Sequence, residues 1–216
     1  YLEIGDSFKH GESMHTLIDN GVLSKLFFEL EQDKPDSKKE FQIDRELYLH
    51  QQDAIEKTND RRNIVVTTGT GSGKTECFVI PIINELLREK EKGKLTPGVR
   101  AILIYPMNAL ANDQMKRLRD LLSSYEDITF GVYNGNTKQT DQAGIDEYGR
   151  VFKDIDGTPL KPLKNEVISR DSMQEAPPHI LVTNYAMLEY MLLRPKDDLV
   201  FSGADLKYIV LDEAHI

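Results

Sequence analysis

Cysteine and long apolar runs are scarce in this sequence. The chain has 216 residues and one cysteine, Cys77, so it cannot form an internal disulfide, which is typical of proteins from a reducing compartment. No apolar run approaches membrane-spanning length, and no charged-then-apolar leader opens the chain. We therefore expect a soluble, cytoplasmic protein. Because the sequence begins with Tyr1 rather than Met, we also expect it to be part of a longer protein.

Positive charge is also in deficit. Lys and Arg together number 27 against 36 for Asp and Glu, which gives a formal net charge of −9. This balance excludes a uniformly basic surface, so any contact with nucleic acid has to be local. The length allows one α/β domain with a substantial core and is too short for two full domains.

The most informative stretch spans residues 64–76 and reads IVVTTGTGSGKTE. A short β-branched run, a glycine-rich turn and a helical pattern predict the order strand, loop, helix. Gly69, Gly71 and Gly73 allow successive N–H groups of the loop to point into one concavity, and the helix adds its positive N-terminal end. The stretch therefore predicts a binding site for a polyphosphate.

The residues of this loop have distinct predicted roles. Lys74 reaches the β- and γ-phosphates, and the Thr75 hydroxyl holds a magnesium ion that bridges them. The strict phosphate-loop pattern, G-x-x-x-x-G-K-[ST], has glycine where this chain has Thr68, but the strand, loop and helix agree with the mechanism. The residues predicted to bind the phosphates are Thr70, Gly71, Ser72, Gly73, Lys74 and Thr75.

Apolar strands alternate with amphipathic helices along the rest of the chain. Five runs of strand length begin at Ile64, Ala101, Ile128, Ile180 and Tyr208. This alternation predicts a three-layer α/β fold with a mainly parallel central sheet that helices cover on both faces. In such sheets ligands bind at the carboxyl ends of the strands, where the glycine loop and the other motifs are placed.

Two segments depart from the alternation. Residues 1–45 are predicted to be a helical lead-in and a linker, because Leu23, Phe27 and Leu30 recur at helical spacing before a polar run. Residues 138–178 are polar, contain several glycines and prolines, and include GRVFKDIDGTPL, which predicts a hairpin of two short strands. We expect this second segment to be a surface insertion.

The last apolar strand ends in two carboxylates, Asp212 and Glu213. Asp212 can hold the magnesium ion, usually through water, while Glu213 can accept a proton from an attacking water. An acidic pair after a strand is weak evidence alone, because acidic residues often end strands. Together with the glycine loop it specifies a nucleoside-triphosphate site with a catalytic base.

These motifs resemble those of superfamily 2 DEAD/DEAH-box helicases. Residues 212–215 read DEAH, TGTGSGKT resembles the first helicase motif, and HQQDAI resembles the glutamine motif that reads adenine. The resemblance implies ATP and Mg²⁺ as cofactors, and a RecA-like ATP-binding domain over residues 46–216 that a second RecA-like domain follows in the parent protein. It implies that Gln51, or alternatively Gln52, reads adenine, and that His215 couples hydrolysis to movement between the domains.

A further set of residues resembles the motifs with which these helicases grip the nucleic-acid backbone. YPMNALANDQ has Met107 and Asn108 where the family commonly has Thr and Arg, so one charge-assisted phosphate contact is lost. Thr183 and Asn184 resemble a second backbone-contacting motif, and Gly135 resembles the glycine that lets a strand approach the sugar-phosphate chain. The residues predicted to contact nucleic acid are Pro106, Asn108, Ala109, Leu110, Gly135, Thr183 and Asn184.

The resemblance implies the ATP-binding half of an ATP-driven helicase or translocase. The segments YPMNALANDQ and PPHILVTNYAMLEYMLLRP most resemble the sequences of large bacterial helicases of the mitomycin-repair and DISARM phage-defence type. This resemblance favours DNA over RNA as the partner. Two alternatives stay open: an ATP-switched binding module of a defence or repair complex, and the motor of a restriction nuclease. Because an arginine of the second domain completes the site in this family, the chain alone is expected to hydrolyse ATP very slowly.

Overall fold

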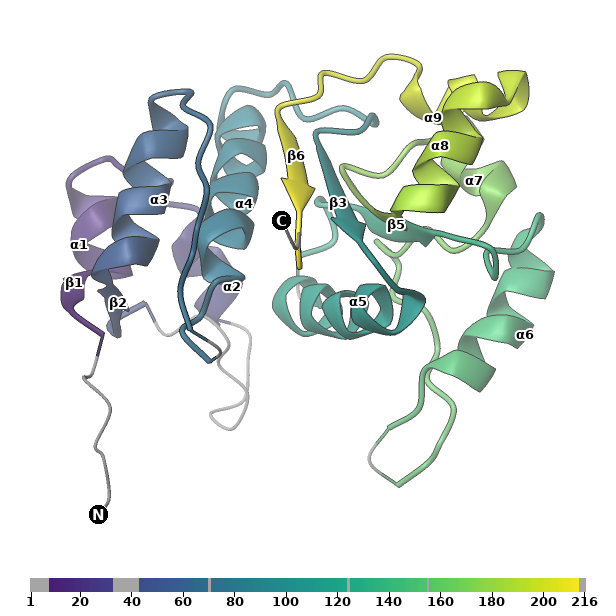
Figure 1. Ribbon diagram of the computed structural model, residues 1–216, viewed down its shortest axis with the longest axis horizontal. Helices are drawn as coiled ribbons and strands as arrows, with labels where there is room; N and C mark the ends of the chain where they lie inside the picture. Colours follow the sequence, from purple (N-terminus) through teal and green to yellow (C-terminus); the bar gives the residue numbers. More distant parts are fainter. Residues whose placement is uncertain (1–7, 33–42, 70, 124, 155, 214–216) are drawn as a thin grey trace. The chain divides into compact units, whose positions relative to one another are not determined.

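The structure is a computed structural model that describes residues 8–32, 43–69, 71–123, 125–154 and 156–213. The chain divides into two compact units, Tyr1–Leu95 and Thr96–Ile216, and each is described by itself (Figure 1). Within the described ranges, every helix is too short or too polar to cross a bilayer.

The first unit combines helices with a small antiparallel sheet. Its described elements are β1 (His10–Ser13), α1 (Met14–Asp19), α2 (Phe27–Gln32), β2 (Glu46–Tyr48), α3 (Leu49–Asn59) and α4 (Glu76–Glu91). Helix α3 packs against α4, and most of α4 is buried, including Ile80, Ile83 and Leu86. Helix α4 continues through Pro81 in its second turn. The predicted helix after the glycine loop is therefore confirmed.

The predicted strand before the glycine loop is not a strand in the structure. Residues 62–69 have no regular secondary structure, and Val65 is 86% exposed. Among the described residues, the sheet of this unit contains only β1 and β2. A β-branched run becomes a strand only when a neighbouring strand pairs with its N–H and C=O groups. No strand among the described residues of its unit pairs with this run. The expectation of five strands is therefore wrong for this one.

The lead-in differs from its prediction as well. It is not helical throughout, because β1 pairs with β2 in an antiparallel ladder. Residues 46–48 are consequently a strand, and α3 follows it directly from Leu49. Phe27 and Leu30 are buried as expected. Most of the predicted linker falls in residues 33–42, which lie outside the described part of the chain.

The second unit has a parallel sheet with the strand order β4-β5-β3-β6. The strands are β3 (Ala101–Tyr105), β4 (Phe130–Tyr133), β5 (Ile180–Asn184) and β6 (Tyr208–Leu211). Ile104 lies opposite Thr183 on one side and opposite Leu211 on the other. The carboxyl ends of these strands are thus aligned along one edge, and the predicted parallel sheet of an α/β fold is confirmed.

Helices cover both faces of this sheet (Figure 1). They are α5 (Asn108–Leu122), α6 (Asp141–Val151), α7 (Arg170–Glu175), α8 (Tyr185–Leu193), the 3₁₀ helix η1 (Pro195–Asp197) and α9 (Asp198–Phe201). On one face, Ile102 and Ile104 of β3 share a core cluster with Met191 of α8 and Val200 of α9. On the other face, α5 buries Met115 and packs against β3, β4 and β5. The three predicted layers are therefore present.

The hairpin predicted within residues 138–178 is reduced to a single bridge. Helix α6 runs as far as Val151, so the first predicted strand is mostly helical. Lys153 and Pro159 form an isolated antiparallel bridge, and Gly157 has a φ of +82° between them, in the region that favours glycine. The predicted turn is confirmed and the two predicted strands are wrong.

Part of the later half of the same segment, within residues 165–173, is buried rather than placed on the surface. Glu166 is 6% exposed and Met173 is fully buried. The N–H of Val167 donates to the carbonyl of Phe130 at 2.8 Å, so the segment continues the hydrogen bonding of the sheet beside β4. Arg119 of α5 donates to Glu166 Oε2 at 2.9 Å. The expected surface position is therefore wrong for residues 165–173, because backbone pairing and a buried carboxylate hold them against the core.

Candidate functional site

The glycine loop of the first unit has two residues in the left-handed backbone region. The φ angle is +76° at Gly71 and +72° at Gly73, where a side chain would strain the backbone. A Cβ atom at Gly73 would collide with the side chains of Gln51 and Glu76, whereas one at Gly71 would meet nothing within 4 Å. Glycine is therefore required at both positions, and the open space at Gly71 leaves room for a ligand. Thr70 lies outside the described residues.

Side chains close this loop on itself. The Lys74 ammonium donates to the Thr68 carbonyl at 3.2 Å, and the hydroxyls of Thr68 and Ser72 share a hydrogen bond of 2.6 Å. Ser72 is only 1% exposed. Thr68, where the strict pattern has glycine, therefore supplies a hydroxyl that fastens the loop. The departure from the pattern is compatible with a well-formed phosphate loop.

Thr75 is the residue that begins α4. It occupies the N-cap position, and its side chain makes no capping hydrogen bond. A hydroxyl oxygen at the positive end of a 16-residue helix is a suitable ligand for Mg²⁺ beside a phosphate. Together with the open backbone at Gly71 and the cation of Lys74, this donor set fits a magnesium-bound polyphosphate.

Gln51 contacts the glycine loop from α3. Its Nε2 donates to the Gly73 carbonyl at 3.0 Å, its Oε1 accepts from the Tyr48 N–H at 2.9 Å, and the residue is 1% exposed. Both ends of the side-chain amide are therefore engaged within the protein. This geometry does not support the predicted adenine contact and gives Gln51 a role in holding the loop.

The two sequence neighbours of Gln51 on α3, His50 and Gln52, also make hydrogen bonds within the first unit. His50 Nε2 lies 2.9 Å from the Ser72 carbonyl, so a second side chain holds the loop. Sequence reasoning missed this role, because a histidine in HQQDAI has no distinctive signal. Gln52, the alternative adenine reader, accepts from the Glu12 N–H and donates to Glu56, at 2.8 and 2.9 Å. It too is occupied by contacts within its unit.

The carboxyl edge of the second unit brings two predicted nucleic-acid motifs together. Asn184 Nδ2 donates to Asn108 Oδ1 at 2.8 Å, and Asn184 Oδ1 accepts from the Met187 N–H and so caps α8. One side chain therefore holds the starts of both α5 and α8. Pro106 and Ala109 are exposed beside this contact, and Leu110 is half-buried.

The remaining two predicted contacts differ from each other. Thr183 is fully buried, and its hydroxyl donates to the Tyr133 carbonyl at 2.7 Å. It cannot contact a nucleic acid in this structure and instead holds β5 to β4, so the predicted direct contact is not supported. Gly135 is exposed, and a Cβ there would meet nothing within 4 Å. Its surroundings agree with close approach of an external backbone.

The acidic pair follows β6 on the same edge. The Asp212 N–H donates to the Ile104 carbonyl at 3.1 Å, which continues the pairing of β6 with β3. The Glu213 N–H donates to Asp212 Oδ1 at 2.9 Å, and Glu213 has a φ of +51°, which is uncommon for a residue with a side chain. Such strain clusters at functional sites. His215 lies outside the described residues.

Sequence reasoning also missed Tyr105, the last residue of β3. Tyr105 is 3% exposed. Burial and the nearby Asp212 carboxylate raise the pKa of its hydroxyl, and the Arg117 cation opposes this shift. The hydroxyl is therefore neutral and close to Asp212. The available signal was its place as the first residue of YPMNALANDQ.

The fold and the loop define the class of this protein. An α/β architecture with a parallel sheet, a closed glycine loop before a helix and an acidic pair after a strand is typical of phosphate-loop nucleoside-triphosphate-binding proteins. The family model described as DEAD/DEAH box helicase matches residues 48–216. The chain therefore belongs to the DEAD/DEAH box helicase family, as its motifs predicted.

Curated relatives are much longer than this chain. Druantia protein DruE of Escherichia coli (strain UMEA 4076-1) is 33% identical over 78% of this chain and 14% of its own length. ATP-dependent helicase Lhr-Core of Methanothermobacter thermautotrophicus is 33% identical over 75% of this chain and 16% of its own length. The chain thus spans about a seventh of the length of these relatives.

Solved structures support the fold. The structure is similar to one titled "Crystal Structure of DUF1998 helicase MrfA bound to DNA", with a TM-score of 0.62 and 23% identity. The match covers 95% of this chain and 22% of that one. A second structure of the same helicase, titled as bound to DNA and AMPPNP, matches with a TM-score of 0.61.

Proposed function

We propose that this chain is the ATP-binding part of an ATP-dependent nucleic-acid helicase or translocase. The observation that carries the proposal is the closed glycine loop, in which Gly71 and Gly73 take the left-handed conformation and Lys74 folds back to Thr68. The loop lies in a member of the DEAD/DEAH box helicase family, and several similar proteins are named ATP-dependent helicases.

Each residue of the nucleotide site has a role in this proposal. Lys74 contacts the β- and γ-phosphates, and Thr75 and Asp212 hold Mg²⁺, which offsets the charge of the phosphates when it is bound. Glu213 accepts a proton from the attacking water. Gln51 positions the Gly73 end of the loop and does not read the base.

A second set of residues binds the nucleic acid. The sugar-phosphate backbone is contacted by Pro106, Ala109 and Leu110, by the Asn108–Asn184 pair, and by Gly135 of the same unit. Thr183 positions β5. DNA is the favoured partner, since a structurally similar helicase has been solved bound to DNA. Backbone contacts of this kind give little sequence preference and a strong dependence on salt.

The proposal extends to the parent protein. A RecA-like domain over residues 46–216 is followed by a second one, which supplies an arginine to the γ-phosphate, and His215 couples the two. The buried Cys77 favours the cytoplasm as the location. The alternative of an ATP-switched binding module differs only in lacking turnover, which an ATPase assay decides.

The first experiment tests ATP binding. Lys74→Ala should weaken magnesium-dependent ATP binding ten- to hundredfold, because a charge-assisted contact contributes about 1.5–3 kcal/mol. Calorimetric titration measures this, and Lys57→Ala, which removes an exposed lysine of α3, is the matched control. Equal affinities of the Lys74→Ala variant and the unchanged chain for ATP would contradict the assignment of the site.

The second experiment tests turnover. ATPase activity is measured with single-stranded DNA, duplex DNA and RNA, for this chain and for the longer parent protein. The chain alone should turn over very slowly, and the parent should be faster by about 10³ or more, the usual contribution of an arginine finger. Glu213→Gln in the parent should abolish that gain while ATP still binds. A parent that binds ATP without turnover would favour the binding module.

A further inference from the structure

Two buried side chains of the second unit have polar atoms without hydrogen-bond partners. Tyr105, at the end of β3, is 3% exposed and Gln114, on the buried face of α5, is 7% exposed. Neither the Tyr105 hydroxyl nor Gln114 Nε2 has a hydrogen-bond partner among the described residues. Buried donors without partners are costly, so each instance requires an explanation.

The register of the sheet brings Tyr105 beside Asp212. Ile104 pairs with Leu211, and the Asp212 N–H donates to the Ile104 carbonyl at 3.1 Å, so Tyr105 and Asp212 are the next residues across the two strands. Residues directly opposite each other point to the same face of a sheet. Ile104 faces the cluster under α8, so Tyr105 and Asp212 both face the opposite layer, which α5 covers.

The Tyr105 hydroxyl has charged groups near it, at the carboxyl end of this face. The charges of both Asp212 and Arg117 act on the hydroxyl, and Arg117 lies one helical turn after Gln114 on α5. Asp212 Oδ1 accepts one hydrogen bond, from the Glu213 N–H. An ionised carboxylate can accept about four hydrogen bonds, so Asp212 has capacity for more.

We propose that Tyr105 is a positioning residue for Asp212, acting through one buried water that Gln114 also binds. The Tyr105 hydroxyl and Gln114 Nε2 donate to the water, and the water donates to the Asp212 carboxylate. Three partners are the usual number for a buried water. The arrangement fixes the carboxylate for Mg²⁺ and links it to α5, the helix that begins in the predicted nucleic-acid motif. It rests on the proposed function, in which Asp212 holds the metal.

The test compares variants of the full 216-residue chain by ATP titration at a series of Mg²⁺ concentrations. Tyr105→Phe keeps the ring and removes the hydroxyl, and we expect it to raise the Mg²⁺ concentration for half-maximal ATP binding about fivefold, the effect of one hydrogen bond. Gln114→Leu should change it in the same direction. The matched control is Tyr125→Phe, which removes the hydroxyl of another buried tyrosine, beyond the far end of α5, and should leave the Mg²⁺ requirement unchanged.

Two further measurements separate this inference from a simpler explanation. In the absence of nucleotide and metal, Tyr105→Phe should lower the Tm, whereas loss of a hydroxyl that is merely unpaired would raise it. In the Asp212→Asn background, Tyr105→Phe should have no further effect on the Mg²⁺ requirement. An unchanged Mg²⁺ requirement together with a raised Tm overturns the inference alone. ATP binding by the unaltered chain that is independent of Mg²⁺ would overturn the proposed metal site, and the inference with it.

Discussion

Gln51 and Gly73 are joined by a hydrogen bond of 3.0 Å from the side-chain amide of one to the main-chain carbonyl of the other. The bond ties the Gly73 end of the phosphate loop to α3. The left-handed Gly73 has no space for a side chain, because Gln51 and Glu76 occupy it. The loop is therefore preorganised by the helix that precedes it in sequence, and binding a polyphosphate requires little rearrangement at this end.

The first prediction follows from that contact. Gln51→Leu should weaken ATP and GTP binding by the same factor, about five- to tenfold, because the lost bond of about 1–1.5 kcal/mol holds the loop rather than the base. Titration with both nucleotides measures the two affinities. Gln52→Leu, whose side chain contacts Glu12 and Glu56, is the control and should change neither. A loss confined to ATP would restore the adenine-reading role.

The second prediction concerns the pair that joins the two nucleic-acid motifs. Asn184→Ala removes the cap of α8 and the contact with Asn108 together, and it should lower the free energy of unfolding by about 1–2 kcal/mol. Combining it with Asn108→Ala should cost less than the sum of the two single changes, since both remove one shared bond. Urea denaturation of the unchanged chain, the two single variants and the double variant gives the free energies of unfolding for this double-mutant cycle. Strictly additive effects would show that the two motifs are not coupled.

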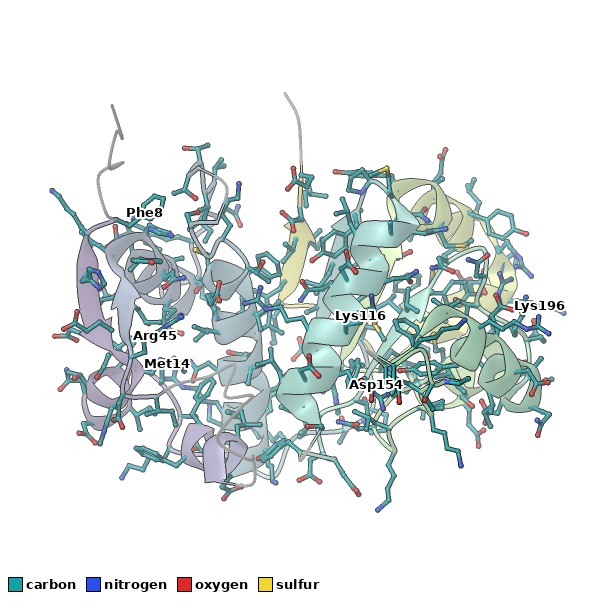
Figure 2. All side chains as sticks on the ribbon, turned by 90° about the horizontal axis from the view of Figure 1, so that it is seen from below. Phe8, Met14, Arg45, Lys116, Asp154 and Lys196 are labelled. Atoms are coloured by element: carbon teal, nitrogen blue, oxygen red, sulfur yellow. The ribbon has the colours of Figure 1, made fainter. Side chains whose placement is uncertain are left out.

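The third prediction concerns the buried part of residues 138–178. Burial raises the pKa of Glu166, while Tyr148 and Arg119 oppose that shift by stabilising the carboxylate. Arg119→Met leaves this carboxylate without its cation and should lower the free energy of unfolding by about 3 kcal/mol. Urea denaturation measures the loss. The matched control is Lys116→Met, on the exposed side of α5 (Figure 2), which should change it by less than about 0.5 kcal/mol.

Proteolysis gives the same prediction a second readout. In the unchanged chain, a nonspecific protease should cut first at the exposed turn around Asp156 and spare residues 165–173. In the Arg119→Met variant, cleavage should extend into residues 165–173, because the ion pair with Glu166 no longer holds these residues against α5. Early cleavage of residues 165–173 in the unchanged chain would contradict their assignment to the core.

The fourth prediction is a dependence of stability on pH. Burial lowers the pKa of His179 to about 4, and its ring lies between Thr129 and the Thr96 carbonyl. In the unfolded chain His179 binds a proton near pH 6.5, whereas in the folded chain it does so only near pH 4. The folded state therefore loses no free energy to this protonation above about pH 6.5. Stability should fall by about 1.4 kcal/mol per pH unit as the pH drops from there toward 4. Thermal unfolding of the unchanged chain and of His179→Gln, which should lose this slope, checks it.

Much of the candidate site was readable from the sequence because its chemistry is local. Gly71, Gly73, Lys74 and Thr75 lie within five residues of one another, so their spacing alone predicted a loop that the structure forms. The strand before Asp212 was recognisable for the same reason. Hydrophobic runs likewise predicted five strands, and the four from β3 to β6 form the parallel sheet. The clearest signals belong to β3 and β5, since burial on both faces leaves a near-continuous apolar pattern.

The tertiary structure alone decided which of these side chains are free to meet a ligand. Thr183 matched its motif, yet its hydroxyl is used by Tyr133, a residue 50 positions away. Gln51 matched its motif as well, and its amide is used by Gly73. Residues 64–67 carry a strand composition, yet no strand in the described part of their unit pairs with them. A motif specifies which chemical groups are present, whereas burial and hydrogen bonding depend on partners distant in sequence, which only the folded chain brings together.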